Sequence, residues 1–191
     1  MDRALEWAEA ELRHTSAFET LIGARSFDDG ARWEPIDDQL DLGIGLQVPF
    51  LGDRTVTLER PTDWLSWDLG LAYAFDRSER TSATVESQIV DLSVGLLAQP
   101  PDPRIRLKPF VGAGWNTGFA RAEVDVGGGR ERERDVVGGP YARAGLRFFW
   151  EPRRFFGAEV RWRAGDDENP VDLIGARIES TSLSVVFGTT F

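Results

Sequence analysis

Few residues in this chain have both the type and the spacing of a catalytic site. The single histidine, His14, stands two positions before Ser16, and Glu19 follows shortly after. A serine nucleophile needs a base within reach, and His14 is the only imidazole available for that role. The chain has no cysteine, which excludes a thiol nucleophile, a thiolate metal site and disulfides. A site built from several histidines of one chain is excluded by the same count.

Two other stretches resemble ligand sites only in part. Gly127–Gly129 has the composition of a phosphate-binding loop, but no Lys-Ser or Lys-Thr pair follows it. Asp166–Asn169 gathers acidic side chains without the ligand spacing of a calcium-binding loop. We interpret both stretches as solvated loops, with a divalent-cation cluster as the weaker alternative for the second. We therefore expect no catalytic residue, no cofactor and no metal site.

The charge and hydropathy of the chain exclude further classes of protein. The 191 residues carry a formal net charge of −10, which argues against nucleic-acid binding and against a polybasic membrane-surface protein. No run of about 18 apolar residues predicts a transmembrane helix. The opening residues Met1–Arg3 do not resemble a signal peptide, so we expect an exported protein to be represented here by its mature form.

Most of the chain shows a strict alternation of apolar and polar positions, which is typical of β-strands with two unlike faces. From Leu65 to Phe75, for example, large apolar residues occupy every second position and small or acidic residues stand between them. The same pattern predicts the other strands, the first of them more weakly: Phe18–Phe27, Leu40–Phe50, Val90–Leu96, Leu107–Phe119, Ala142–Phe148, Phe156–Trp162 and Leu183–Phe191. The chain is therefore predicted to be an all-β, eight-stranded antiparallel up-and-down barrel.

The composition of the two faces indicates which one points outward. The apolar face carries bulky residues such as Trp67, Trp115 and Trp162, which would not fit together inside so narrow a barrel. The other face is mainly glycine, alanine and serine with isolated charges, whereas a soluble barrel would present Lys, Glu and Thr to water. We therefore predict that the apolar face contacts lipid and that the barrel is transmembrane.

Charged residues on the second face would then lie inside the barrel. Charges enclosed in this way must pair or stay hydrated. We predict an ion-pair network in the lumen, with structural filling favoured over an ion path. Its principal members are Asp41, Asp68, Asp91, Arg106, Lys108, Arg143, Glu159 and Arg161; Glu19, Arg25, Arg147 and Arg163 share their face.

The connections suggest an orientation. Outer-membrane barrels have short periplasmic turns and long outer loops. Residues 99–104 and 151–154 are short predicted turns, although residues 51–63 form a long connection where a short one is expected. The predicted outer loops cover residues 26–39, 77–87, 121–138 and 164–180. Residues 1–16 are a predicted helical or flexible extension with a short amphipathic helix, and residues 17–191 form the barrel.

Two segments resemble a known family. The chain ends in an alternating strand with Phe187, Gly188 and a terminal Phe191, which resembles the signal read by the outer-membrane assembly machinery. Arg104–Gly114 contains a Pro-Phe-Val-Gly-Ala-Gly phrase similar to one common in small barrels of the OmpA, OmpX, OmpW and opacity-protein type. The resemblance implies a bacterial outer-membrane location, with outer-membrane lipid, lipopolysaccharide and the assembly machinery as partners.

A fold shared by anchors, adhesins, channels and lipid enzymes does not assign one activity. The leading hypothesis is a non-enzymatic barrel with a structural or surface-interaction role. A narrow channel for ions or small solutes is an alternative, supported by the polar lumen. Some small barrels of this kind remove acyl chains from lipid A with a His-x-Ser pair, which His14–Ser16 matches, but its place before the first strand disfavours that activity. A soluble lipocalin-like binder of apolar ligands, with the apolar face inside, is the remaining alternative.

Overall fold

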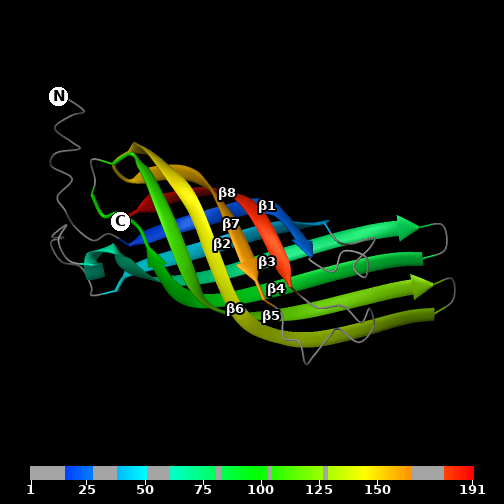
Figure 1. The fold of residues 1–191 in the computed structure, drawn as a ribbon. Coiled ribbons are helices and arrows are strands. Elements are labelled where there is room, and N and C mark those ends of the chain that lie inside the picture. The colour runs from blue at the N-terminus through cyan, green and yellow to red at the C-terminus, as the bar shows by residue number, and fades with distance from the viewer. Residues whose placement is uncertain are drawn as a thin grey trace.

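The computed structural model describes residues 16–27, 38–50, 61–80, 83–102, 105–126, 129–164 and 179–191. They form an eight-stranded antiparallel barrel with its strands in sequence order (Figure 1). The strands are β1 (Ala17–Phe27), β2 (Asp38–Pro49), β3 (Leu65–Arg80), β4 (Ala83–Ala98), β5 (Leu107–Val126), β6 (Gly129–Glu151), β7 (Arg154–Arg163) and β8 (Ser180–Thr190). A short 3-10 helix, Pro61–Trp64, precedes β3. The predicted N-terminal helix lies outside the described residues.

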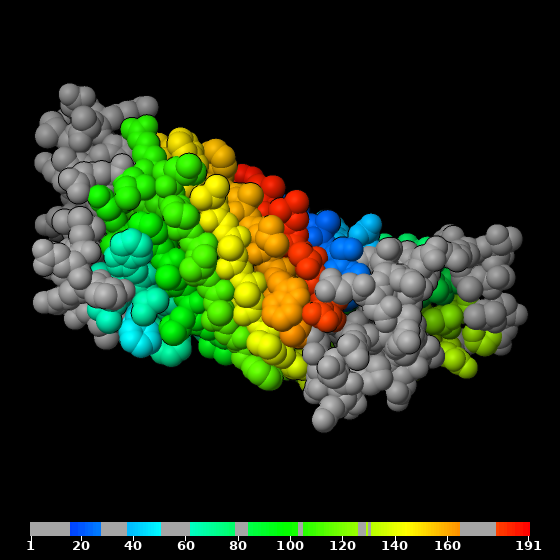
Figure 2. Space-filling view, viewed as in Figure 1, coloured from blue at the N-terminus to red at the C-terminus, as the bar shows by residue number. Residues whose placement is uncertain are grey.

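The barrel closes where the first strand pairs with the last. β1 and β8 are paired from Ala17 opposite Thr190 to Phe27 opposite Ser180. The wall is continuous around the molecule, and β5 to β8 follow one another as diagonal bands in Figure 2. The start of β1 and the end of β8 lie at one end of the barrel, which we call the turn side, and the opposite end is the loop side (Figure 1).

The alternation in the sequence becomes the two faces of this wall. Most large apolar side chains on the outer face are 37–65% exposed, whereas most charged side chains of the second face are buried inside. This orientation is opposite to the one that a soluble lipocalin-like barrel requires. In the described part of the chain, no helix has the length and apolar character needed to cross a membrane.

The predicted connections are partly right. Residues 151–154 form the tight turn between β6 and β7, and residues 99–106 join β4 to β5. Most of the predicted loops 77–87 and 121–138 is wrong, because both segments continue the strands. Alternating charges and β-branched residues sustain these extensions, since Glu123 stands opposite Arg132 and forms an ion pair with it at 2.9 Å. Residues 28–37, 51–60 and 165–178 lie outside the described residues.

The small residues of the inner face make room for a few large side chains. A Cβ at Gly188 of β8 would collide with the ring of Phe155 on β7, and one at Gly114 of β5 would collide with Tyr141 on β6. Small and large residues therefore alternate across neighbouring strands, which packs the narrow interior.

Candidate functional site

The most elaborate group of polar side chains lies inside the barrel and is centred on Arg143 of β6. Its guanidinium contacts Glu19 of β1 at 2.6 Å, Glu159 of β7 at 2.6 Å and Asp68 of β3 at 3.1 Å. Arg147 contacts the other oxygen of Glu19 at 2.5 Å. Arg161 contacts Glu159 at 3.2 Å. These six residues, Glu19, Asp68, Arg143, Arg147, Glu159 and Arg161, form the turn-side ionic cluster.

A second group lies nearer the loops. Arg25 of β1 contacts both Asp91 of β4 and Asp41 of β2. Arg163 of β7 contacts the same two carboxylates, each at 3.4 Å. The Asn116 amide donates a hydrogen bond of 3.2 Å to Asp91. Arg25, Asp41, Asp91 and Arg163 form the loop-side ionic cluster.

Each cluster is balanced in charge by itself. The turn-side ionic cluster has three carboxylates and three guanidiniums, and the loop-side ionic cluster has two of each. Their side chains are at most 6% exposed. A buried charge is tolerated when it is paired and hydrogen-bonded, so this balance accounts for ten ionised groups inside one barrel.

Uncharged polar side chains complete the turn-side ionic cluster. The Tyr141 hydroxyl donates a hydrogen bond of 2.9 Å to Asp68. Arg147 donates to the amide oxygens of Gln47 and Gln99 at 2.8 and 2.7 Å. Gln47 in turn donates to Glu19 at 3.1 Å. The hydrogen-bonding capacity of Glu19 and Asp68 is thus largely used, which strengthens the network in a low dielectric.

Apolar side chains close the interior at both ends. On the turn side, Phe149 and Phe155 pack with each other, and the Arg147 guanidinium lies over the rings of Phe110 and Phe155 at 4.3 and 4.9 Å. The turn-side apolar cluster consists of Ala17, Leu21, Phe149, Phe155 and Val186. The loop-side apolar cluster consists of Phe27, Ala74, Ile89, Ala120 and Val137. Apolar and ionic side chains therefore fill the interior together, because Leu21 of the turn-side apolar cluster lies between Glu19 and Arg25 along β1.

A small cavity lies where the two ionic clusters meet. Its volume is about 10 Å³, and Asp41, Glu159, Arg161, Arg163 and Ser182 are among its lining residues. This volume suits one water molecule, and the lining offers it charged and hydroxyl partners. The lumen at this level is therefore a packed polar core.

The structure brings six of the eight predicted network residues into the two ionic clusters, and Lys108 and Arg106 lie outside them. Asp41, Asp68, Asp91, Arg143, Glu159 and Arg161 occupy the two ionic clusters. Lys108 is buried but lies apart from them, with its ammonium 5.0 Å from the centre of the Phe149 ring. Arg106 does not lie in the lumen: it is exposed before β5, because the strand begins only at Leu107.

Sequence reasoning missed the aromatic residues of the interior. Phe110 stands at an inward position of β5, and Phe149 and Phe155 stand at inward positions of β6 and β7. A signal was present, because Phe148–Phe149 and Phe155–Phe156 are consecutive pairs. In a strand, one member of such a pair must face inward.

The residues of the predicted assembly signal occupy different surroundings. Phe187 is 47% exposed on the outer face, and Gly188 lies inward against Phe155. Phe191 is 65% exposed, and its backbone amide donates to the Ser16 carbonyl at 2.9 Å. Recognition of these residues by the assembly machinery stays a prediction.

Two of the sites considered from the sequence include residues that the structure does not describe. His14 and Asp166–Asn169 both lie outside the described ranges, so neither the His14–Ser16 pair nor the acidic loop can be placed. Within the described ranges, no group of three or more His, Cys, Asp or Glu side chains is arranged to hold a metal ion.

Comparison with known proteins relates this architecture to solved barrels. No family model and no curated protein sequence matches the chain. A major outer membrane protein of Thermus thermophilus matches with TM-score 0.61 and 11% identity over 93% of this chain and 100% of its own. OprG of Pseudomonas aeruginosa matches with TM-score 0.57 and 14% identity over 95% and 98% of the two chains. Neisserial surface protein A matches with TM-score 0.56 and 14% identity over 94% and 97%. The chain therefore has the fold of the small eight-stranded outer-membrane β-barrels.

Proposed function

We propose that the protein lies in the outer membrane of a bacterium and acts there as a closed barrel with a structural or surface-interaction role. The outer face supports the membrane location, because exposed aliphatic residues form a band between two sets of exposed aromatic ones. The turn-side set includes Trp64, Trp67, Trp150, Phe156 and Phe187, and the loop-side set includes Tyr73, Phe75, Phe119 and Trp162.

The filled interior carries the proposal of a closed barrel. Two neutral ionic clusters fill the middle, and the apolar clusters containing Phe155 and Phe27 lie toward the two ends. An ion entering such an interior would have to leave water and would find the charges of both ionic clusters already paired. Contacts with partners would then be made by the outside of the barrel.

The strand extensions offer such an outside surface. β3 to β6 continue together as a protruding sheet, formed by Asp76–Arg80, Ala83–Gln88, Arg121–Val126 and Gly129–Arg134 (Figure 1). Its outer face bears cross-strand ion pairs, including Arg77 with Glu86 at 3.2 Å. Rigid paired strands can hold a binding surface clear of the membrane more precisely than a long loop.

A narrow channel is the second candidate, favoured by the polar layers in the middle of the lumen. Conductance in planar bilayers distinguishes the two functions. We expect no channel events at either polarity from protein that shows the heat-modifiable gel shift of a folded barrel. Reproducible single-channel steps from that folded protein would overturn the closed-barrel proposal.

We further propose that the role is non-enzymatic. His14 is the only imidazole in the sequence that could serve Ser16 as a base. Ser16 immediately precedes β1 at the turn side. Folded protein incubated with lipid A is expected to leave the thin-layer mobility of the lipid unchanged. Release of fatty acid that is lost in a Ser16→Ala variant would contradict this.

A further inference from the structure

Two arginines face each other on the outer surface of the barrel wall. Arg121 of β5 stands directly opposite Arg134 of β6, and both point outward. Like charges in directly opposed positions of a sheet repel each other. Glu123 is the nearby carboxylate, but it is shared between Arg121 at 3.1 Å and Arg132 at 2.9 Å. Among the described residues no acidic side chain is paired with Arg134, so this point of the surface carries excess positive charge.

The arginine pair lies at the edge of the apolar band. The next row of outward side chains toward the turn side consists of Val90, Phe119 and Val136, which are cross-strand partners. Phe119 and Val136 are 46% and 55% exposed. Beyond the arginines, toward the loop side, the outward positions are mostly charged. The pair is thus placed where the headgroups of a membrane begin.

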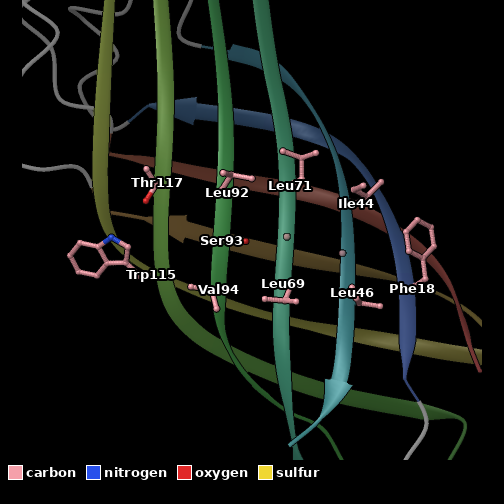
Figure 3. Close-up of a pocket in the computed structure, with 12 residues that line it drawn as sticks. Phe18, Ile44, Leu46, Leu69, Leu71, Leu92, Ser93, Val94, Trp115 and Thr117 are labelled. Atoms are coloured by element: carbon pink, nitrogen blue, oxygen red, sulfur yellow. The ribbon is translucent and has the colours of Figure 1, made fainter.

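An apolar groove crosses the outer surface of the wall on the turn side of the arginine pair (Figure 3). It runs between two cross-strand rows of outward residues, and the backbone of Gly45, Gly70 and Ser93 forms its floor. The upper row is Thr117, Leu92, Leu71 and Ile44, and the lower row is Trp115, Val94, Leu69, Leu46 and Phe18. Figure 3 shows that these residues come from β5 through to β1.

The groove is within reach of the arginine pair. Thr117 precedes Arg121 by four residues on β5, a separation of about 13 Å along the strand. A fatty acyl chain can span this separation. A molecule with an anionic head and an apolar tail would therefore match both features at once.

We propose that this face of the barrel binds one phosphorylated lipid, with its phosphate held by Arg121 and Arg134 and an acyl chain in the groove. Phosphate suits the pair because guanidinium groups donate parallel, charge-assisted hydrogen bonds to its oxygens. A bound phosphate would also relieve the repulsion between the two arginines. The proposal rests on the outer-membrane location proposed above, where lipid A is the phosphorylated lipid of the outer leaflet.

The test measures retention of lipid by the full chain in detergent, using native mass spectrometry. The probes are bisphosphorylated lipid A and the same lipid after enzymatic removal of its phosphates. We expect the unmodified protein to retain the phosphorylated form about tenfold better, and a double variant Arg121→Gln, Arg134→Gln to lose that preference. The variant Arg154→Gln is the matched control, because Arg154 is an exposed arginine on the turn-side rim, 63% accessible, paired with Glu151 at 3.5 Å.

Further outcomes separate the parts of the proposal. Thr117→Trp fills the groove and is expected to lower retention of both lipids while keeping the preference for phosphate. Millimolar inorganic phosphate is expected to leave the lipid bound, and its full displacement would reduce the site to a plain anion site. An unchanged preference in the double variant, or in Arg134→Gln alone, would overturn the proposal. A heat-modifiable gel shift of each protein shows independently whether the barrel is folded, so lipid retention lost through misfolding is recognised separately.

Discussion

The two ionic clusters of the lumen are built from the same residue types but differ in how their charges are connected. In the turn-side ionic cluster, Arg143 serves three carboxylates, and its contacts with Glu19 and Glu159 are both 2.6 Å. In the loop-side ionic cluster, two arginines share two carboxylates, and Arg163 reaches each of them at 3.4 Å. One central arginine therefore joins all three carboxylates of the turn side, whereas two arginines share the two carboxylates of the loop side.

The side chains that surround the two ionic clusters also differ. Aromatic rings of Phe110 and Phe155 lie against Arg147 on the turn side. On the loop side the additional partners are the small polar groups of Asn116 and Ser182. The difference suggests that the turn side sets the stability of the barrel and that the loop side can tolerate local change.

The largest effect is expected from Arg143→Met. Asp68 would lose its cationic partner, while Glu19 would keep Arg147 and Glu159 would keep Arg161. Removing one partner of a buried ion pair costs about 3–5 kcal/mol. We expect a loss in that range in urea unfolding of the protein in lipid vesicles, followed by tryptophan fluorescence. A loss below about 1 kcal/mol would mean that water already solvates the cluster and that the contrast between the clusters is wrong.

A smaller loss is expected when the aromatic seal of the turn side is removed by Phe155→Ala. Phe155 is fully buried against Gly188 and packs with Phe149. Truncating a buried phenylalanine leaves a cavity and costs about 3 kcal/mol or more. Phe27→Ala is the matched change on the loop side, and we expect it to cost less because Phe27 ends its strand, where neighbours can relax. Equal losses in the same unfolding assay would remove the distinction.

Arg163→Met tests the loop-side ionic cluster directly. Arg25 remains in contact with both Asp41 and Asp91 after this change, so the carboxylates keep a cation. We expect a loss of about 2 kcal/mol, the contribution of hydrogen bonds to a charged group. A loss as large as that of Arg143→Met would show that the two arginines cannot substitute for each other.

The smallest effect is expected on the protruding sheet. Arg77 pairs with Glu86 at 3.2 Å, but its side chain is 60% exposed. Exposed ion pairs contribute about 0–1 kcal/mol, and salt weakens them further. Arg77→Gln should leave the unfolding midpoint nearly unchanged at about 0.15 M salt. A marked destabilisation would indicate that the extension is coupled to the barrel core.

The barrel and the direction of its two faces could be predicted from the sequence, because alternation is maintained through nearly every strand. The same pattern places Glu19, Asp68 and Arg143 on one inner face. The alternation cannot predict which of these residues form ion pairs, because the partners of Arg143 depend on strand register and on which rotamers reach across the lumen. The end of an alternating run is equally ambiguous, which is why the sequence wrongly predicts Arg106 inside the lumen and a loop over residues 121–138.

The turn-side ionic cluster also constrains the order in which this protein can be built. Glu19 lies on the first strand, and its partner Arg143 is 124 residues later in the chain. A hairpin entering lipid before β6 and β7 had arrived would expose an unpaired carboxylate or guanidinium to hydrocarbon, at a high cost. Insertion one hairpin at a time is therefore disfavoured. The strands must gather around a hydrated interior that loses most of its water only when the first and last strands meet.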